Sequence, residues 1–136
     1  MRSAQARGSV ALNARAIRAL LMHPSGHEVL TAARTAGIAA IEATPALIGS
    51  SDGVEFSGAA LDLVVKGNGV EISALVHTSD NIDVATQALT AVTVAAISLI
   101  GHARDVCPSA SIEYVRLDDV PVMFADGVPA RRSSGL

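Results

Sequence analysis

The feature that most constrains the fold is a pair of apolar stretches joined by Gly67-Asn68. The first stretch reads VEFSGAALDLVV and the second reads VEISALVHT. Gly-Asn is a favourable centre for a two-residue hairpin turn, because such turns need backbone angles that these residues adopt at little cost. The turn pairs apolar residues on one face of the sheet: Val65 with Val70, Leu63 with Ile72 and Leu61 with Ala74. The opposite face carries a mixed set that suits water or another subunit: Asp62, Val64, Glu71, Ser73, Leu75 and His77.

Two long helical patterns flank this hairpin in the sequence. Apolar residues recur on one stripe over residues 27–43, before Pro45 is expected to disturb the helix end, and again over residues 84–103. A short strand at 8–12, a helix at 14–23 that begins after the capping residue Asn13, and a strand at 111–117 complete the order. The order is βαββαβ and predicts a ferredoxin-like α+β fold, in which two long helices cover one face of an antiparallel sheet. We expect one domain over residues 1–136, with residues 1–7 and about 122–136 as loosely ordered tails.

Composition excludes several classes of function. The core must be built from Ala, Val, Leu and Ile, because the chain has two Phe, one Tyr and no Trp. A net charge of −3 argues against nucleic acid as a partner, since phosphate binding needs a concentrated basic surface. Polar residues interrupt the apolar segment at 84–100, which favours a buried helix over a membrane span. The N-terminal residues resemble no secretory signal, so we expect a cytoplasmic protein that does not bind membranes.

Several segments together resemble the molybdenum-cofactor biosynthesis protein C family, the cyclic pyranopterin monophosphate synthases. They are EVLTAARTAGIAAIEAT, the hairpin, QALTAVTVAAISLI and VRL, in this order and spacing over roughly residues 8–118. The resemblance implies a ferredoxin-like subunit and a homohexamer built from three dimers. It also implies an active site at a subunit interface that needs neither a metal nor another cofactor. Family members rearrange a small molecule, a cyclised dihydro-GTP triphosphate, into a cyclic phosphate pterin and release pyrophosphate.

The chain departs from the family pattern where that resemblance places the active site. The family's Lys-Gly-Asp before the first long helix is here Gly26-His27-Glu28, and Asp52 stands where the family has the histidine of a Cys-His-Pro loop. The family's glutamate-containing lead-in to the second long helix is here residues 83–87, and its Asp-x-x-Lys is matched by Gly101 and Arg104. Arginine keeps the charge of lysine but is always protonated, so it cannot serve as a base. His27, Glu28, Asp52 and His102 are therefore the candidate catalytic residues. The candidate substrate-binding residues are Arg34, His77, Asp83 and Arg104.

Each candidate also has a structural interpretation. His102 and Arg104 suit a helix C-terminus, where cations are favourable, and Asp83 suits a helix N-terminus. His77 with Asp80 and Asp83 matches no standard metal-binding spacing, so no metal site is predicted. His23, which precedes a proline, is interpreted as a surface residue, and Cys107 as an unreactive thiol.

Three functional hypotheses follow. In the first, the chain is a divergent relative of the synthase, a lyase, isomerase or cyclase acting on a small metabolite by acid–base catalysis in a pocket between subunits. His27 or His102 would be the acid–base group, Asp52 or Glu28 would orient it, and Arg104 would bind an anion. In the second, the chain is a non-catalytic ligand-binding or assembly subunit. In the third, it retains the synthase activity of molybdenum cofactor biosynthesis.

Overall fold

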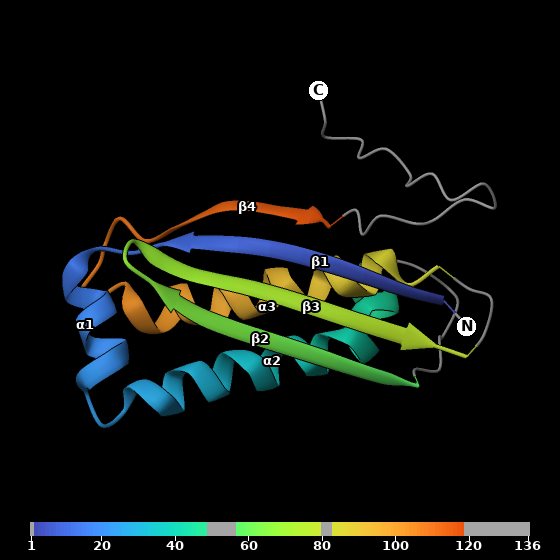
Figure 1. Cartoon of the computed structure of the whole chain (residues 1–136), viewed down its shortest axis with the longest axis horizontal. Coiled ribbons are helices and arrows are strands. Elements are labelled where there is room, and N and C mark those ends of the chain that lie inside the picture. Colours follow the sequence, from blue (N-terminus) through green and yellow to red (C-terminus); the bar gives the residue numbers. More distant parts are fainter. Residues whose placement is uncertain (1, 49–56, 80–82, 119–136) are drawn as a thin grey trace, which may run out of the picture.

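A four-stranded antiparallel sheet carries its long helices on one face (Figure 1). The computed structural model describes residues 2–48, 57–79 and 83–118. The strands are β1 (Arg2–Ala11), β2 (Gly58–Lys66), β3 (Gly69–Thr78) and β4 (Ser111–Leu117), and the helices are α1 (Ala14–Met22), α2 (Gly26–Ile48) and α3 (Ala85–Ala103). Within these residues the sheet order is β2-β3-β1-β4. The element order and the one-sided packing confirm the ferredoxin-like α+β prediction.

The β2–β3 hairpin has the register that the sequence predicts. Leu61 pairs with Ala74 and Val65 pairs with Val70, as expected for a turn centred on Gly67-Asn68. Alternate residues of β3 are buried against the helices, from Val70 to Thr78, and the residues between them are half-buried on the other face. The alternation therefore fixes which side of the sheet the helices cover.

Strand β1 is longer than the sequence indicated. Residues 2–7 were expected to form part of a loose tail, but β1 begins at Arg2, which pairs with Thr78 at the far end of β3. The segment RSAQAR is polar and small, so its strand conformation comes from pairing with β3 rather than from its own pattern. The other expected tail, residues 122–136, lies outside the described residues.

Helix α2 continues through Pro45 to Ile48, so the expectation that proline disturbs the helix near residue 43 is wrong. Proline removes the hydrogen bond that its own nitrogen would donate four residues back. In the last turn this loss is limited to one bond. The preceding residue, Thr44, is buried and its hydroxyl donates to the Ala40 carbonyl oxygen at 2.7 Å.

Small residues let α2 and α3 approach each other and the sheet closely. The buried residues of this seam include Ala33, Gly37 and Ala40 on α2 and Ala88, Ala91 and Ala95 on α3. By length and composition α3 is the one described helix that could cross a membrane. Its buried residues, from Gln87 to Ala103, instead pack inside the fold, as the sequence predicted for a core helix.

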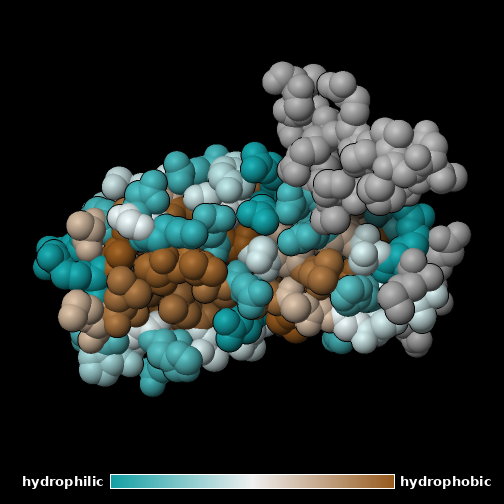
Figure 2. All heavy atoms as spheres, in the orientation of Figure 1, coloured by the Kyte–Doolittle hydropathy of each residue, from teal (hydrophilic) through white to brown (hydrophobic). Residues whose placement is uncertain are grey.

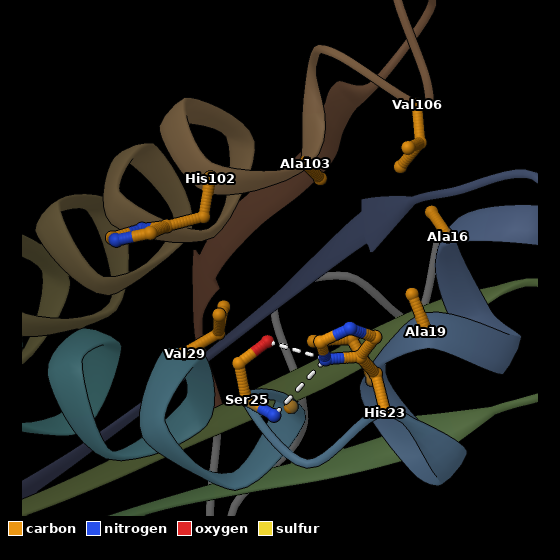
Figure 3. A pocket seen from close by; sticks show the side chains of 10 residues that line it. Ala16, Ala19, His23, Ser25, Val29, His102, Ala103 and Val106 are labelled. Atoms are coloured by element: carbon orange, nitrogen blue, oxygen red, sulfur yellow. Dashed lines mark hydrogen bonds between the residues drawn. The ribbon is translucent and has the colours of Figure 1, made fainter.

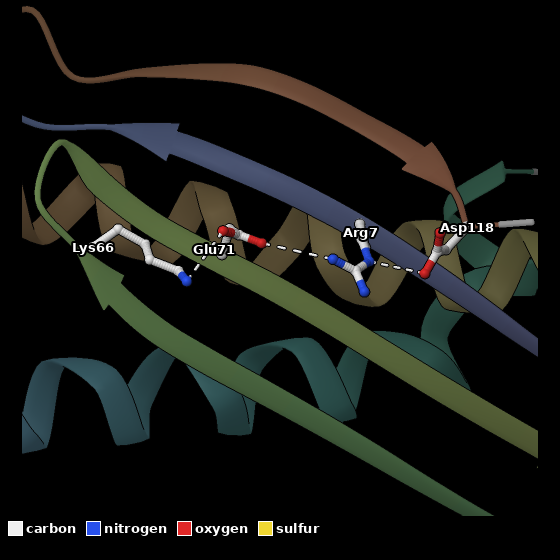
Figure 4. A network of polar contacts seen from close by, with 4 residues as sticks. All are labelled: Arg7, Lys66, Glu71 and Asp118. Carbon is white, nitrogen blue, oxygen red and sulfur yellow. Dashed lines mark hydrogen bonds and ion pairs between the residues drawn. The ribbon is translucent and has the colours of Figure 1, made fainter. Parts of the chain in front are cut away.

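The sheet face opposite the helices carries a polar network that joins residues of β1, β2 and β3 to Asp118, which follows β4 (Figure 4). Arg7 Nε of β1 donates a hydrogen bond to Oδ2 of Asp118 at 2.8 Å. The Nη1 atom of Arg7 lies 3.7 Å from Oε1 of Glu71 on β3. Glu71 also lies 3.7 Å from Lys66 Nζ of β2. The hydrogen bond and the negative charge of Asp118 raise the pKa of Arg7. Figure 2 shows this face, where an apolar area near the hairpin end adjoins hydrophilic side chains.

Candidate active site

A pocket of about 180 Å³ lies where α1, the start of α2 and the end of α3 meet (Figure 3). Its lining is mostly aliphatic, with three polar side chains. The lining residues are Ala16, Ala19, Leu20, His23, Ser25, Gly26, Val29, His102, Ala103 and Val106. The pocket exists because α2 and α3 run in opposite directions, which brings the first turn of one beside the last turn of the other.

Asn13 connects α1 to the segment that follows α3, and each of these two elements contributes to the pocket lining. The Asn13 side chain accepts a hydrogen bond from Ala16 N at 2.8 Å, which caps α1 as predicted, and its Nδ2 donates to the Val106 carbonyl oxygen at 3.1 Å. Asn13 N also donates to the sulfur of Cys107 at 3.3 Å. Cys107 is 1 % exposed, which agrees with the interpretation of an unreactive thiol.

His23 and Ser25 form a hydrogen-bonded pair on the wall of this pocket. Pro24 lies between them, in the short link from α1 to α2. His23 Nδ1 accepts from Ser25 N at 3.1 Å and lies 2.7 Å from Ser25 Oγ. Sequence reasoning placed His23 on the surface, and it is exposed, but the pocket was missed. The available signal was the spacing His-Pro-Ser, because a proline turn brings the residues on either side of it together.

His102 contributes to the opposite wall from α3. Its Nδ1 lies 2.8 Å from the Ser98 carbonyl oxygen, which can only accept, so Nδ1 donates this bond. The ring therefore folds back along its own helix, as Figure 3 shows. In the neutral form Nε2 is left as the acceptor.

Gly26 is buried at the base of the pocket, where no side chain fits. A Cβ built on it would lie 2.9 Å from the Ala19 carbonyl oxygen, and closer still to that of Leu20. The family resemblance matches this position to a lysine. The absence of a side chain here is thus built into the contact between α1 and α2.

The other predicted residues at this end of the molecule lie outside the pocket. His27 and Glu28 are exposed in the first turn of α2, where the carboxylate of Glu28 is favoured by the helix dipole. Arg104 is exposed at the C-cap of α3. The structure thus gathers His27, Glu28, His102 and Arg104 around one end, and of these only His102 lines the pocket.

A second group of predicted residues lies at the opposite end of α3. Asp83 Oδ1 accepts from Ala85 N at 2.9 Å, so the residue supports the start of the helix, as its structural interpretation held. His77 is half-buried near the end of β3 on the open face of the sheet, paired with Ser3 and Gly58. The prediction for Asp52 falls outside the described residues.

Gln87 belongs to this second group and was not among the predicted site residues. It is 7 % exposed, and within the described residues its Oε1 is the buried side-chain oxygen that has no hydrogen-bond partner. Buried polar atoms without partners are rare in folded proteins, and each asks for an explanation. Its position within the lead-in to α3, which the family resemblance matches to glutamates, was the signal that could have found it.

Arg34 has a structural contact that the sequence did not indicate. Its Nε donates to the Leu61 carbonyl oxygen at 3.0 Å, which ties α2 to the edge strand β2. Among the residues described, no three His, Cys, Asp or Glu side chains are grouped so that they could hold a metal ion.

The chain has a ferredoxin-like α+β fold, and the described candidate residues lie mainly at the two ends of its helix α3. The MoaC family profile matches residues 1–120, and the chain belongs to this family. It is 39% identical over 120 residues to the cyclic pyranopterin monophosphate synthase of Streptomyces avermitilis. The matched segment covers 87% of this chain and 70% of the relative. It is 39% identical over 119 residues to the synthase of Streptomyces coelicolor, covering 86% and 69%. It is 36% identical over 104 residues to the cyclic pyranopterin monophosphate synthase 2 of Mycobacterium tuberculosis, covering 76% and 59%.

Proposed function

We propose that this chain is a divergent cyclic pyranopterin monophosphate synthase-like lyase, isomerase or cyclase. It acts on a small biosynthetic metabolite by acid–base catalysis, at a site completed by two subunits. Membership of the MoaC family and the names of the relatives support the class of enzyme. The structure supports the shared site.

The observation that carries the proposal is the separation of the candidate residues. Helix α3 has 19 residues, so its ends are about 27 Å apart at 1.5 Å per residue. His102 and Arg104 lie at one end and Asp83 at the other. A small metabolite cannot span this distance, so the acid–base residues at one end and the substrate-binding Asp83 at the other cannot contact the same molecule within one subunit. A second subunit that places its α3 start beside the first subunit's α3 end would complete the set.

The roles follow from the chemistry of each half. At the first end His27 or His102 is the acid–base group, Glu28 orients it, and Arg104 binds an anion or a developing oxyanion. At the second end His77 and Asp83 bind substrate. Asp52, which lies outside the described residues, is the alternative orienting carboxylate. The Nε atom of Arg34 is engaged by the Leu61 carbonyl oxygen, so Arg34 can bind substrate only through its other guanidinium nitrogens. The assembly is a homo-oligomer, and the family resemblance favours a hexamer of three dimers.

A second candidate, the pterin-forming activity itself, is favoured by the 39% identity to named synthases. Gly26 argues against the pterin-forming activity. The family resemblance places a lysine at this position, but the surrounding backbone of α1 leaves no room for a side chain. A non-catalytic binding or assembly subunit is the third candidate, and it would keep the pocket without the chemistry.

Incubation of the purified protein with the cyclised dihydro-GTP triphosphate, followed by mass spectrometry, tests the proposal. We expect unchanged substrate from a protein that light scattering confirms as a folded oligomer. Release of pyrophosphate with formation of the cyclic pterin would overturn the proposal in favour of the authentic synthase. If a metabolite that co-purifies with the protein is turned over, turnover that is unaffected by His27→Ala and His102→Ala would show that the assigned residues are wrong.

A further inference from the structure

The pocket beside His23 lacks the charges that a phosphorylated ligand would need. None of its ten described lining residues is Asp, Glu, Lys or Arg. Phosphate recognition relies on several cations or backbone donors that converge on the oxygens. Moving a phosphate dianion into a mostly aliphatic pocket would leave most of its oxygens without partners, which is costly.

The size of the pocket limits its occupant to one ring. A cavity of about 150 Å³ lined by aliphatic side chains holds a benzene molecule. The present pocket, at about 180 Å³, has room for one such ring with a small substituent. Val29, Val106 and Leu20 supply aliphatic surface for the faces of that ring.

The hydrogen bonds of His23 fix which of its nitrogens carries the proton. A backbone N–H can only donate, so the bond from Ser25 N requires a lone pair on His23 Nδ1. In the neutral ring the proton is therefore on Nε2, on the edge away from Ser25. The Ser25 hydroxyl, 2.7 Å from Nδ1, donates to the same lone pair and strengthens this choice. His23 thus offers one donor, held in a set orientation by the turn at Pro24.

We infer that this pocket binds a neutral, single-ring portion of the substrate that carries a hydrogen-bond acceptor, and that Nε2–H of His23 anchors this acceptor. The ring lies against the aliphatic wall and its carbonyl or ring nitrogen accepts from His23. The inference rests on the proposed function in taking the pocket as part of the substrate site. His23 is then a residue that determines specificity, in addition to the acid–base groups proposed above.

The test uses three ring compounds that differ at one substituent. Amide chemical shifts of the full chain are followed at pH 8 during titration with acetophenone, ethylbenzene and phenyl phosphate. Acetophenone is expected to shift the amides of Val29 and Val106 in a saturable way. Ethylbenzene, which lacks the acceptor, is expected to bind about three- to tenfold more weakly, the range for losing one neutral hydrogen bond. Phenyl phosphate is expected to bind at least about tenfold more weakly than acetophenone, because its charge is not matched.

Variants separate the anchor from the pocket. His23→Phe keeps a ring of similar shape without the donor, so it should weaken acetophenone about three- to tenfold and leave ethylbenzene unchanged. Ala19→Leu fills the pocket and should abolish the binding of both. Met22→Ala is the matched control, because Met22 adjoins His23 in sequence but is 77% exposed and does not line the pocket.

Equal or tighter binding of phenyl phosphate, or acetophenone binding that is unchanged in His23→Phe, would overturn the inference. So would the absence of saturable shifts at the pocket amides in a protein whose spectrum shows it folded. A long-range ¹H–¹⁵N spectrum of the imidazoles checks the anchor directly, and a proton found on Nδ1 of His23 would exclude it. Failure of the proposed function can be told apart from failure of this inference. Pterin formation in the turnover assay would overturn the proposed function, but it would not change the result of these titrations.

Discussion

Gly37 of α2 lies directly against the backbone of Ala91 in α3. A Cβ at residue 37 would come within 2.7 Å of the Ala91 carbonyl oxygen, and within 2.7 Å of the Leu61 side chain on the sheet. Such distances are shorter than ordinary van der Waals contact, so only glycine fits without a shift of the helices. The glycine of the ARTAGI segment is thus explained by helix packing rather than by chemistry.

Gly37→Ala is expected to destabilise the fold. Overpacking costs about 1–3 kcal/mol, and the better helix propensity of alanine returns up to about 1 kcal/mol. The net loss in the free energy of unfolding should be about 1–2 kcal/mol, measured by urea denaturation. Gly101→Ala is the matched control, because a Cβ there meets nothing within 4 Å. This control should gain about 0.5–1 kcal/mol. A Gly37→Ala protein as stable as the control would show that the seam can open without cost.

Arg7→Met is expected to destabilise the protein more than Lys66→Met. Arg7 bridges Asp118 and Glu71, whereas Lys66 has one ion pair at 3.7 Å. The Asp118 side chain is 12% exposed, and that of Arg7 is 42% exposed, so solvent screens the network in part. We expect a loss of about 1 kcal/mol for Arg7→Met and at most about 0.5 kcal/mol for Lys66→Met. The difference in unfolding free energy should shrink in 1 M salt, where the screening length is about 3 Å. A difference that is independent of salt would contradict an electrostatic origin.

Gln87→Met is expected to stabilise the chain. The substitution keeps the shape of the side chain and removes a buried oxygen without a partner among the described residues. The free energy of unfolding should rise by about 1 kcal/mol. Gln5→Met, the same change at a half-buried position, should stay within about 0.5 kcal/mol of the parent protein. A destabilised Gln87→Met variant would mean that the oxygen has a hydrogen-bond partner outside the described residues.

Cysteines at Asp83 and His102 should cross-link two subunits rather than one. The ends of α3 are about 27 Å apart, which is too far for an internal bridge through a short cross-linker. In a Cys107→Ala background, Asp83→Cys combined with His102→Cys should give covalent dimers with a short bismaleimide on a reducing gel. Each single variant should give far less. Monomers alone from the double variant, at concentrations where light scattering shows an oligomer, would contradict the shared site.

The parts of the fold that depend on neighbouring residues were predictable from sequence. The Gly67-Asn68 turn and the alternation on either side of it determine the β2–β3 register, and Asn13 marks the start of α1. Strand β1 was underestimated because its first residues become a strand only by pairing with β3, which is distant in sequence. The conformational restriction at Pro45 likewise led to a helix end for α2 that was predicted too early. The helix continues to Ile48 because its packing outweighs the loss of one hydrogen bond at Pro45.

The sequence indicated which residues are candidates for the site, but it did not indicate how they are arranged in space. The family resemblance indicated His102 and its neighbours, and the structure places them at one end of the helices. The His23–Ser25 pair depends on the turn between α1 and α2, and the separation of Asp83 from His102 depends on the direction of α3. Neither is visible in a linear pattern of residues.

The seam of small residues between α2 and α3 has a consequence for how such a chain changes over generations. Its tight contacts, such as that of Gly37 with Ala91, lie along the middle of the helices, whereas Gly101 and His102 near the C-terminal end of α3 are exposed. Mutations of Gly101 and His102 therefore leave the seam between α2 and α3 untouched. Selection could thus replace the exposed side chains at this end of α3 one at a time while every intermediate still folded.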